Sequence, residues 1–495
     1  NPSEDEPAEL RPSIEYVPPK PDLDSDPETK KKPPRRAKPL PKNLPQKIEQ
    51  YLQSFGRNYG DTFEFHGVVL VARDGEILFS RGFGFADRAN HRAHSPDTLF
   101  PVGSLTQQFT ATAILQLQEQ GKLKLDDPVR MHVPELPESY DLVTIRHLLS
   151  HTAGVANFTD LPEWIEHRAQ PHTTQELLAR FSDRPLAQPG VEFEPTNSSY
   201  ALLGAVVEQV SKLPYGIYLQ RHVLDPAGMR DSSYKDAQAP SRAAHGYTLL
   251  DDDTLGDAPA IDLSSYGAAA GLVASAEDLV RWDQALYGEK LLRPESIAQM
   301  YTADSAEGYG MGWAVENAYD QVTVSHPGGV EGFNASLVRM LEDRTLIIAL
   351  ANNDAVDCRD ITTGVAQIVY GHRPNEPIEY EQGPAVPTPQ LKQYAGLYTL
   401  SKSSRERLAK EIDPTFLEQL ASVNIEHKGE RLWMHIPVHG SHLMYPQKDK
   451  EHGFFFKDGP GTQAEFHQPA TDGAPAWLNL KQGQTEFLLK KVDFR

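Results

Sequence analysis

Two proline-rich segments divide this chain and constrain its folding more than any other feature. Residues 1–45 combine closely spaced prolines with an acidic first part and a basic run at residues 30–36. Proline donates no backbone hydrogen bond, so neither a helix nor a strand ladder continues through such a segment. Prolines recur densely over residues 373–390. The pattern predicts a tether (1–45), a first domain (46–372), a linker (373–390) and a second domain (391–495).

The first segment buries too little apolar surface to offset the entropy of ordering it. We expect an extended tether there, which is either a plain linker or a segment that spaces the globular part from a membrane anchor or lies along a partner. No run of about 18 apolar residues predicts a membrane span. Because the chain starts at Asn1 rather than Met, we expect a processed or trimmed protein whose targeting signal is gone.

The composition excludes some classes of partner. A net charge of −21 leaves no sustained basic face to neutralise phosphates, so nucleic acid is not expected. Cys358 is the one cysteine in the chain, so no internal disulfide forms. His147 and His151 have the spacing of a metal pair but no third ligand, and His151 is interpreted as a structural hydrogen-bonding residue. We expect no metal and no cofactor.

Local patterns predict an α/β first domain. Alternating apolar residues indicate a hairpin of 67–72 with 76–80, turning at Asp74-Gly75, and three more strands at 322–325, 335–339 and 346–350. Helical patterns occupy 48–59, 111–120, 200–210 and 276–286. Strands at both ends of a mostly helical middle predict one antiparallel sheet with helices on its flanks.

The second domain has a different pattern. Short runs typical of strands lie at 394–398, 431–436, 453–456 and 477–480, separated by Gly, Asp and Lys. This spacing predicts a small antiparallel barrel or sandwich.

A candidate nucleophile lies in the first domain, where Ser104-Leu105-Thr106-Gln107 is similar to the S-x-x-K motif of serine β-lactamases and penicillin-binding proteins. One helical turn separates the first and fourth positions, so both side chains face the same way. In active enzymes the lysine amine takes the serine proton. Gln107 keeps the length, but its amide cannot accept a proton at physiological pH.

Further segments carry a resemblance to the class C β-lactamase and D-alanyl-D-alanine peptidase family over most of residues 45–372. They occur in the family's order: 121–128 (GKLKLDDP), 148–154 (LLSHTAG), 200–204 (YALLG), 271–279 (GLVASAEDL) and 309–313 (YGMGW). The resemblance implies an antiparallel sheet flanked by helices, an all-helical subdomain, and the nucleophile at a helix start beneath a substrate-binding edge strand.

The resemblance also exposes two altered motifs. In the family, Y-x-N supplies a proton-handling tyrosine and an asparagine that holds the substrate amide. Here Pro195 stands at the tyrosine position, while Asn197 is retained. The third motif, [KH]-[TS]-G, survives loosely as His326-Pro327-Gly328, where glycine lets a ligand or backbone approach closely.

Three functions follow as hypotheses. The leading one is an exported pseudoenzyme of the bacterial cell envelope, periplasmic or extracellular, that uses the retained cleft to bind peptidoglycan peptide or a protein partner. Its catalysis is expected to be impaired because Gln107 and Pro195 remove two proton-handling groups. The alternative is a slow serine hydrolase, an esterase or peptidase, with Ser104 as nucleophile and His326 as an unconventional base. The third is a structural component in which the cleft has no remaining use.

Overall fold

The computed structural model describes residues 39–492, apart from 236–239, 251–253, 304–307, 376–380, 410–411, 413–416, 418–419, 437–439, 458–461, 468–475 and 483–484. Most of the expected tether lies outside the described residues. Helix α1 (Leu44–Tyr59) begins with Pro45 in its first turn, where a missing N–H breaks no helical hydrogen bond. Among the described residues, no helix combines the length and the apolar character that crossing a bilayer requires.

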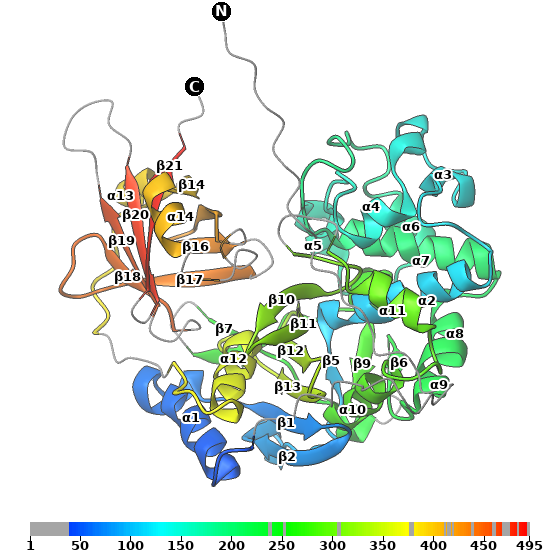
Figure 1. Cartoon of the computed structure of the whole chain (residues 1–495). Coiled ribbons are helices and arrows are strands. Elements are labelled where there is room, and N and C mark those ends of the chain that lie inside the picture. The colour runs from blue at the N-terminus through cyan, green and yellow to red at the C-terminus, as the bar shows by residue number, and fades with distance from the viewer. Residues whose placement is uncertain are drawn as a thin grey trace, which may run out of the picture.

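A six-stranded sheet forms the centre of the first domain, in the order β10-β11-β12-β13-β1-β2 (Figure 1). Every neighbouring pair is antiparallel, and strands from the two ends of the domain meet where Val68 of β1 pairs with Leu350 of β13. This confirms the predicted antiparallel sheet. The strands are β1 (Gly67–Arg73), β2 (Glu76–Phe83), β10 (Ala314–Ala318), β11 (Gln321–Val330), β12 (Phe333–Met340) and β13 (Thr345–Ala351).

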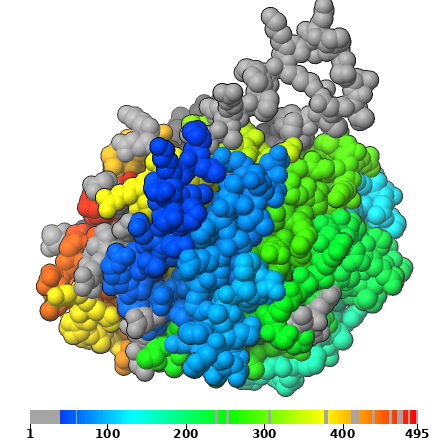
Figure 2. Space-filling model, turned by 90° about the horizontal axis from the view of Figure 1, so that it is seen from below, coloured from blue at the N-terminus to red at the C-terminus, as the bar shows by residue number. Residues whose placement is uncertain are grey.

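The sheet separates two hydrophobic cores because its side chains alternate between faces. Val69 and Val71 pack with α1 and α12 (Cys358–Val369) on the outer face. Val68 and Leu70 pack with the helical subdomain on the inner face. Figure 2 shows α1, in dark blue, between the β1–β2 hairpin and the yellow and orange C-terminal residues.

The helical subdomain surrounds α2 (Thr106–Glu119), which is buried from Thr106 to Leu117, and α7 (Asn197–Ser211). Its other α-helices are α3 (Val129–His132), α4 (Ile145–Leu149), α5 (Pro162–His167), α6 (Thr174–Leu178), α8 (Tyr215–Leu219) and α9 (Asp225–Ala227). Helices α10 (Ala276–Ala285) and α11 (Pro294–Met300) follow along the chain. Short strands complete this part: β3 (Phe85–Asp87), β4 (Arg92–Ala93), β5 (Phe100–Pro101), β6 (Ser233–Tyr234), β7 (Tyr247–Leu249), β8 (Leu255–Asp257) and β9 (Leu272–Ala274).

The C-terminal domain is a closed antiparallel barrel of strands β14 to β21, which decides between the predicted barrel and sandwich. Its strands are β14 (Gly396–Leu400), β15 (Ser422–Lys428), β16 (Arg431–Ile436), β17 (Gly440–Pro446), β18 (Gly453–Phe455), β19 (Thr462–His467), β20 (Trp477–Gln482) and β21 (Thr485–Lys491). Helices α13 (Thr388–Tyr394) and α14 (Lys402–Leu408) accompany them.

One local prediction is wrong in this domain. The strand expected over 394–398 begins only at Gly396, because Tyr394 ends helix α13. Proline in the first turn favours that helix. The Tyr394 ring then stacks on Phe466, with ring centroids 4.3 Å apart, so the aromatic residue that resembled a strand position closes the barrel core instead.

The barrel docks against the outer core of the first domain. Leu443 and Tyr445 of β17 and Phe455 of β18 belong to the same buried cluster as α1 and α12. The ammonium of Lys457 lies 4.5 Å from the ring centroid of Phe63 and 4.2 Å from that of Tyr445. This apolar contact, with a cation over aromatic faces, holds β17 beside the sheet.

Candidate functional site

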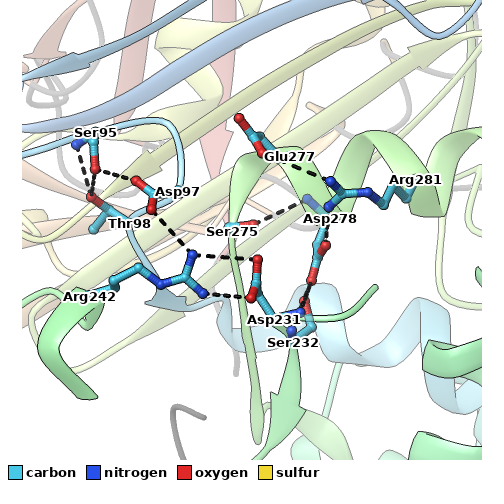
Figure 3. A network of polar contacts seen from close by, with 10 residues as sticks. All are labelled: Ser95, Asp97, Thr98, Asp231, Ser232, Arg242, Ser275, Glu277, Asp278 and Arg281. Carbon is cyan, nitrogen blue, oxygen red and sulfur yellow. Dashed lines mark hydrogen bonds and ion pairs between the residues drawn. The ribbon is translucent and has the colours of Figure 1, made fainter. Parts of the chain in front are cut away.

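A polar network around the buried carboxylate of Asp278 fixes the segment that leads to Ser104 (Figure 3). The Asp278 carboxylate, fully buried at the start of α10, accepts hydrogen bonds from the backbone N–H groups of Asp231 and Ser232. Arg242 forms ion pairs with Asp231 and Asp97, and its carbonyl accepts the Leu99 N–H. These contacts anchor β5, the strand just before the nucleophile turn.

Glycines allow strand β11 to lie directly against the Ser104 turn. Ser104 is in a 3₁₀ turn, Gly103–Leu105, that leads into α2. A Cβ on Gly328 would come 2.2 Å from the Val102 carbonyl oxygen, and one on Gly103 would come 2.4 Å from the Gly329 nitrogen. Gly103 also has a φ of 55°, which glycine tolerates best. Gly328 is predicted to allow a ligand or backbone to approach closely, and in the structure the backbone at Val102 makes this approach.

A pocket of about 330 Å³ opens at this contact. Its lining includes every residue that the sequence singled out for the site: Ser104, Gln107, Pro195, Asn197, His326 and Gly328. It also includes Phe193, together with residues to which the sequence gave no role: Thr196, Tyr309, Asp357, Arg359 and, from the barrel, Ser441. Two sides of β11 and both domains therefore contribute to one pocket.

Gln107 is held by hydrogen bonds at the position of the expected lysine. Its Oε1 lies 3.0 Å from His151 Nε2 and 3.2 Å from the Tyr309 hydroxyl. The Tyr309 hydroxyl also lies 2.8 Å from His326 Nε2. All four side chains are buried, so one hydrogen-bonded network runs from His151, just after α4, to His326 of β11.

The partners of the two histidines fix their protons. His151 Nδ1 accepts the Thr196 N–H at 3.3 Å, so Nε2 carries the hydrogen and donates to Gln107. His326 Nδ1 lies 2.5 Å from the Pro327 carbonyl oxygen, so it is the donor, and Nε2 accepts from Tyr309. Burial lowers the pKa of His151 to about 3, helped by the charge of His326, and lowers the pKa of His326 to about 4. Both rings are therefore neutral at pH 7.

Tyr309, the tyrosine of this hydrogen-bonded network, is also neutral. Burial, and the neighbouring Tyr200 after it, raise the pKa of Tyr309 well above its usual value. Phe193 packs at the edge of the network, its ring centroid 6.2 Å from that of His151 and 5.4 Å from that of Tyr309. The Ser104 hydroxyl, in contrast, makes no hydrogen bond with any described side chain. The site thus combines a free hydroxyl with an uncharged hydrogen-bond network.

Asn197 and Pro195 lie on the opposite wall, at the start of α7. Thr196 caps this helix by accepting the Ser199 N–H, so Pro195 precedes the cap and is exposed toward the pocket. The Asn197 side-chain Nδ2 donates to the Thr159 hydroxyl at 3.0 Å. Its Oδ1 has no partner among the described residues, which leaves an acceptor at the pocket.

A family model described as beta-lactamase matches residues 52–369, more than half of the chain. The chain belongs to the β-lactamase family. PbpX of Bacillus subtilis, whose name assigns it provisionally to the penicillin-binding proteins, is 33% identical over 327 residues, 66% of this chain and 77% of PbpX. Penicillin-binding protein 4* of the same organism is 26% identical over 411 residues, 77% of this chain and 90% of its own length.

Solved structures share the fold of this β-lactamase-family chain. The octameric penicillin-binding protein homologue from Pyrococcus abyssi has a TM-score of 0.60 at 23% identity, covering 90% of this chain and 99% of that one. D-amino acid amidase from Ochrobactrum anthropi has a TM-score of 0.57 at 24% identity, covering 66% of this chain and 96% of its own. At these identities the likeness establishes the fold alone, and the first match extends it over the barrel.

In this family member, an arginine from α12 lies at the pocket mouth. Arg359 donates through Nε and Nη2 to the Asp357 carboxylate, at 2.7 Å for Nη2, and Nη2 lies 3.3 Å from His442 Nε2 of the barrel. Burial raises the pKa of Asp357, but the charge and hydrogen bonds of Arg359, together with the charge of His442, outweigh burial and leave this pKa lowered. Arg359 is separated by long stretches of chain from both Ser104 and the barrel, so no local sequence pattern reveals its place in the pocket.

Proposed function

We propose that the Ser104 pocket binds a peptide-like ligand in the cell envelope, and that it hydrolyses this ligand slowly or not at all. The hydrogen bonding of Gln107 carries the proposal. A lysine amine at this position would be a base for the Ser104 proton, whereas the Gln107 amide oxygen accepts a hydrogen bond from His151 and takes no proton.

The loss of the general base at position 107 should lower the acylation rate strongly. A positioned general base contributes on the order of 10²–10⁴-fold to a rate, and a serine hydroxyl without one is a weak nucleophile. Pro195 also removes the second proton-handling group of the family motif. Because such groups act as one unit, their losses do not multiply, so residual slow acylation is compatible with this proposal.

The free edge of β11 supports ligand binding. Strand β10 pairs with β11 only as far as Ser325, so His326 to Gly329 have β12 on one side and the pocket on the other. An extended peptide can add to such an edge by main-chain hydrogen bonds. Asn197 Oδ1 supplies an acceptor on the facing wall. Pro327 removes one donor from this edge, which weakens the pairing at one position without closing it.

The ligand class follows from the family. Relatives of this chain are named as penicillin-binding proteins, and an envelope peptide that ends in D-Ala-D-Ala is the matching ligand for an exported member. A protein partner that presents an extended segment to the same edge is the other occupant compatible with the pocket.

Slow hydrolysis is the second candidate. Burial keeps His326 neutral, with a pKa of about 4, so its Nε2 has a lone pair. That lone pair faces the Tyr309 hydroxyl at 2.8 Å, so a base role requires Tyr309 either to move or to pass the proton on.

Two measurements separate these functions. A fluorescent penicillin and a fluorophosphonate should label the protein little over minutes. Labelling to stoichiometry that Ser104→Ala abolishes would establish the hydrolase instead. Titration with acetyl-D-Ala-D-Ala and muropeptides should show saturable binding that Asn197→Ala weakens and that Ser104→Ala leaves largely intact. If no ligand binds at millimolar concentration, the structural role replaces the binding role.

A further inference from the structure

A second pocket, of about 310 Å³, lies on the outer face of β11. Residues on this face alternate with those at the Ser104 site: Thr323 pairs with Met340 and Pro327 with Ser336, whereas His326 pairs with Leu337 of the inner core. Helix α12 covers β12 and β13 but leaves a groove along β11. Five residues with hydroxyl side chains are among those that line the groove: Thr323, Ser325, Ser336, Thr362 and Thr363.

The two pockets meet at the edge of β11. His326, Pro327 and Arg359 line both of them. Since no described strand pairs with this edge beyond Ser325, a chain bound near Ser104 can continue around Pro327 to the outer face. Each pocket reaches the lower end of the range for ligand sites, about 300–1,000 Å³. Together they offer room for a ligand longer than a dipeptide.

Two buried polar atoms of this groove have no hydrogen-bond partner among the described residues. Thr323 is 1% exposed and its Oγ1 makes no hydrogen bond. Arg359 uses Nε and Nη2 for Asp357, but its Nη1 is buried and makes none. Buried polar groups are usually paired, and leaving one unpaired is unfavourable. Two such groups in one groove indicate a place where a ligand supplies the missing oxygen atoms.

We propose that this outer groove is a second subsite, which binds an acidic extension of the ligand held at Ser104. The extension's carboxylate accepts from Arg359 Nη1, and a carbonyl or hydroxyl oxygen accepts from Thr323. The carboxylate belongs at the Arg359 end because Glu316 lines another part of the groove and would repel it. This inference rests on the proposed peptide binding and names the kind of peptide.

The first test pairs a ligand change with a protein change. The probes are acetyl-D-Glu-Lys-D-Ala-D-Ala and acetyl-Lys-D-Ala-D-Ala-Glu, with D-Gln or Gln counterparts, because the groove fixes no chain direction. Arg359→Lys keeps a cation beside Asp357 but removes Nη1. We expect one acidic probe to bind about tenfold tighter than its amide counterpart, and Arg359→Lys to abolish that difference, as for a charge-assisted hydrogen bond.

The second test uses Thr323→Val, which removes the unpaired hydroxyl at constant shape. The free protein should gain roughly 1–3 °C in Tm, because an unsatisfied buried group is lost. The same variant should bind the longer probe about three- to tenfold more weakly and acetyl-D-Ala-D-Ala unchanged. The control is Thr345→Val in β13, whose hydroxyl is already bonded to Arg73 Nε at 2.9 Å. It should lower the Tm and leave both affinities unchanged.

The outcomes are distinct. If acetyl-D-Ala-D-Ala binds but neither acidic probe is favoured over its amide counterpart, or Arg359→Lys keeps the preference, the second subsite is refuted and the proposed function stands. If no peptide binds, the proposed function fails with it. A Thr323→Val protein that loses stability shows that its hydroxyl is satisfied without ligand, and this also overturns the inference.

Discussion

Replacing Gln107 by lysine tests the central feature of the site. Gln107 is only 4% exposed, so a lysine at this position would be buried. Its amine would face the His151 Nε2–H, which donates to Gln107 in the native protein, and the nearby Tyr309 hydroxyl. An ammonium there would meet a donor and lose its water, whereas a neutral amine would accept the His151 hydrogen. We therefore expect the pKa of this lysine to fall well below 10.4.

The cost follows from that shift. If the lysine pKa falls to about 7–8, placing the lysine in this environment costs about 3–5 kcal/mol at pH 7 relative to the unfolded chain. Because the unfolded state then binds more protons, the stability of Gln107→Lys should rise with pH. The deficit relative to wild type should shrink by about 1.4 kcal/mol per pH unit between the folded pKa and pH 10.

Urea unfolding at pH 7, 8 and 9 measures this deficit. Gln107→Leu is the matched control, since it removes the same acceptor without adding a titratable group. Gln107→Leu should lose about 1–3 kcal/mol of unfolding free energy because hydrogen-bond donors are left unpaired, and this loss should not change with pH. A Gln107→Lys deficit that is equally flat would refute the reasoning, because it would show that the ammonium reaches solvent and that the network does not hold this position.

Three further outcomes follow. The pKa values of His151 and His326, about 3 and 4, lie below the value of about 6.5 in the unfolded chain. The contribution of these neutral histidines to the free energy of unfolding is therefore complete above pH 6.5. It should be lost as pH falls, by about 2 kcal/mol each between pH 7 and 5, and urea melts should show a shallower loss in His326→Gln. Gln107→Lys with Pro195→Tyr should raise penicillin acylation of Ser104 above either single change; an inert but folded double variant would indicate a remodelled cleft. Removing residues 1–43 should leave the Tm nearly unchanged, and a drop of many degrees would make the tether an interaction arm.

The sequence predicts most where the determinants are local. The Asp74-Gly75 turn, the strand pattern and the ordered family motifs suffice to predict the sheet and a pocket around Ser104. For Gly328, the residue type alone is enough to predict a close contact. Tyr309 was visible only as part of a motif, because its partners Gln107 and His326 are joined to it by folding. Arg359 and Ser441 reach the pocket through docking of α12 and the barrel, which no pattern of neighbouring residues encodes. The choice between barrel and sandwich depended on β14 pairing with β21, which is also a contact between distant segments.

The pairing of β1 with β13 sets the order of events during synthesis. Val68 is made long before its neighbour Leu350, and at about 5–20 residues per second the gap lasts on the order of 15 seconds to a minute. Throughout that time β1 has only β2 beside it and presents one open, apolar edge. Until β13 is made, that edge is open to pairing with a strand of another molecule, and the pocket gains its Ser441 wall only after the ribosome has moved well into the barrel.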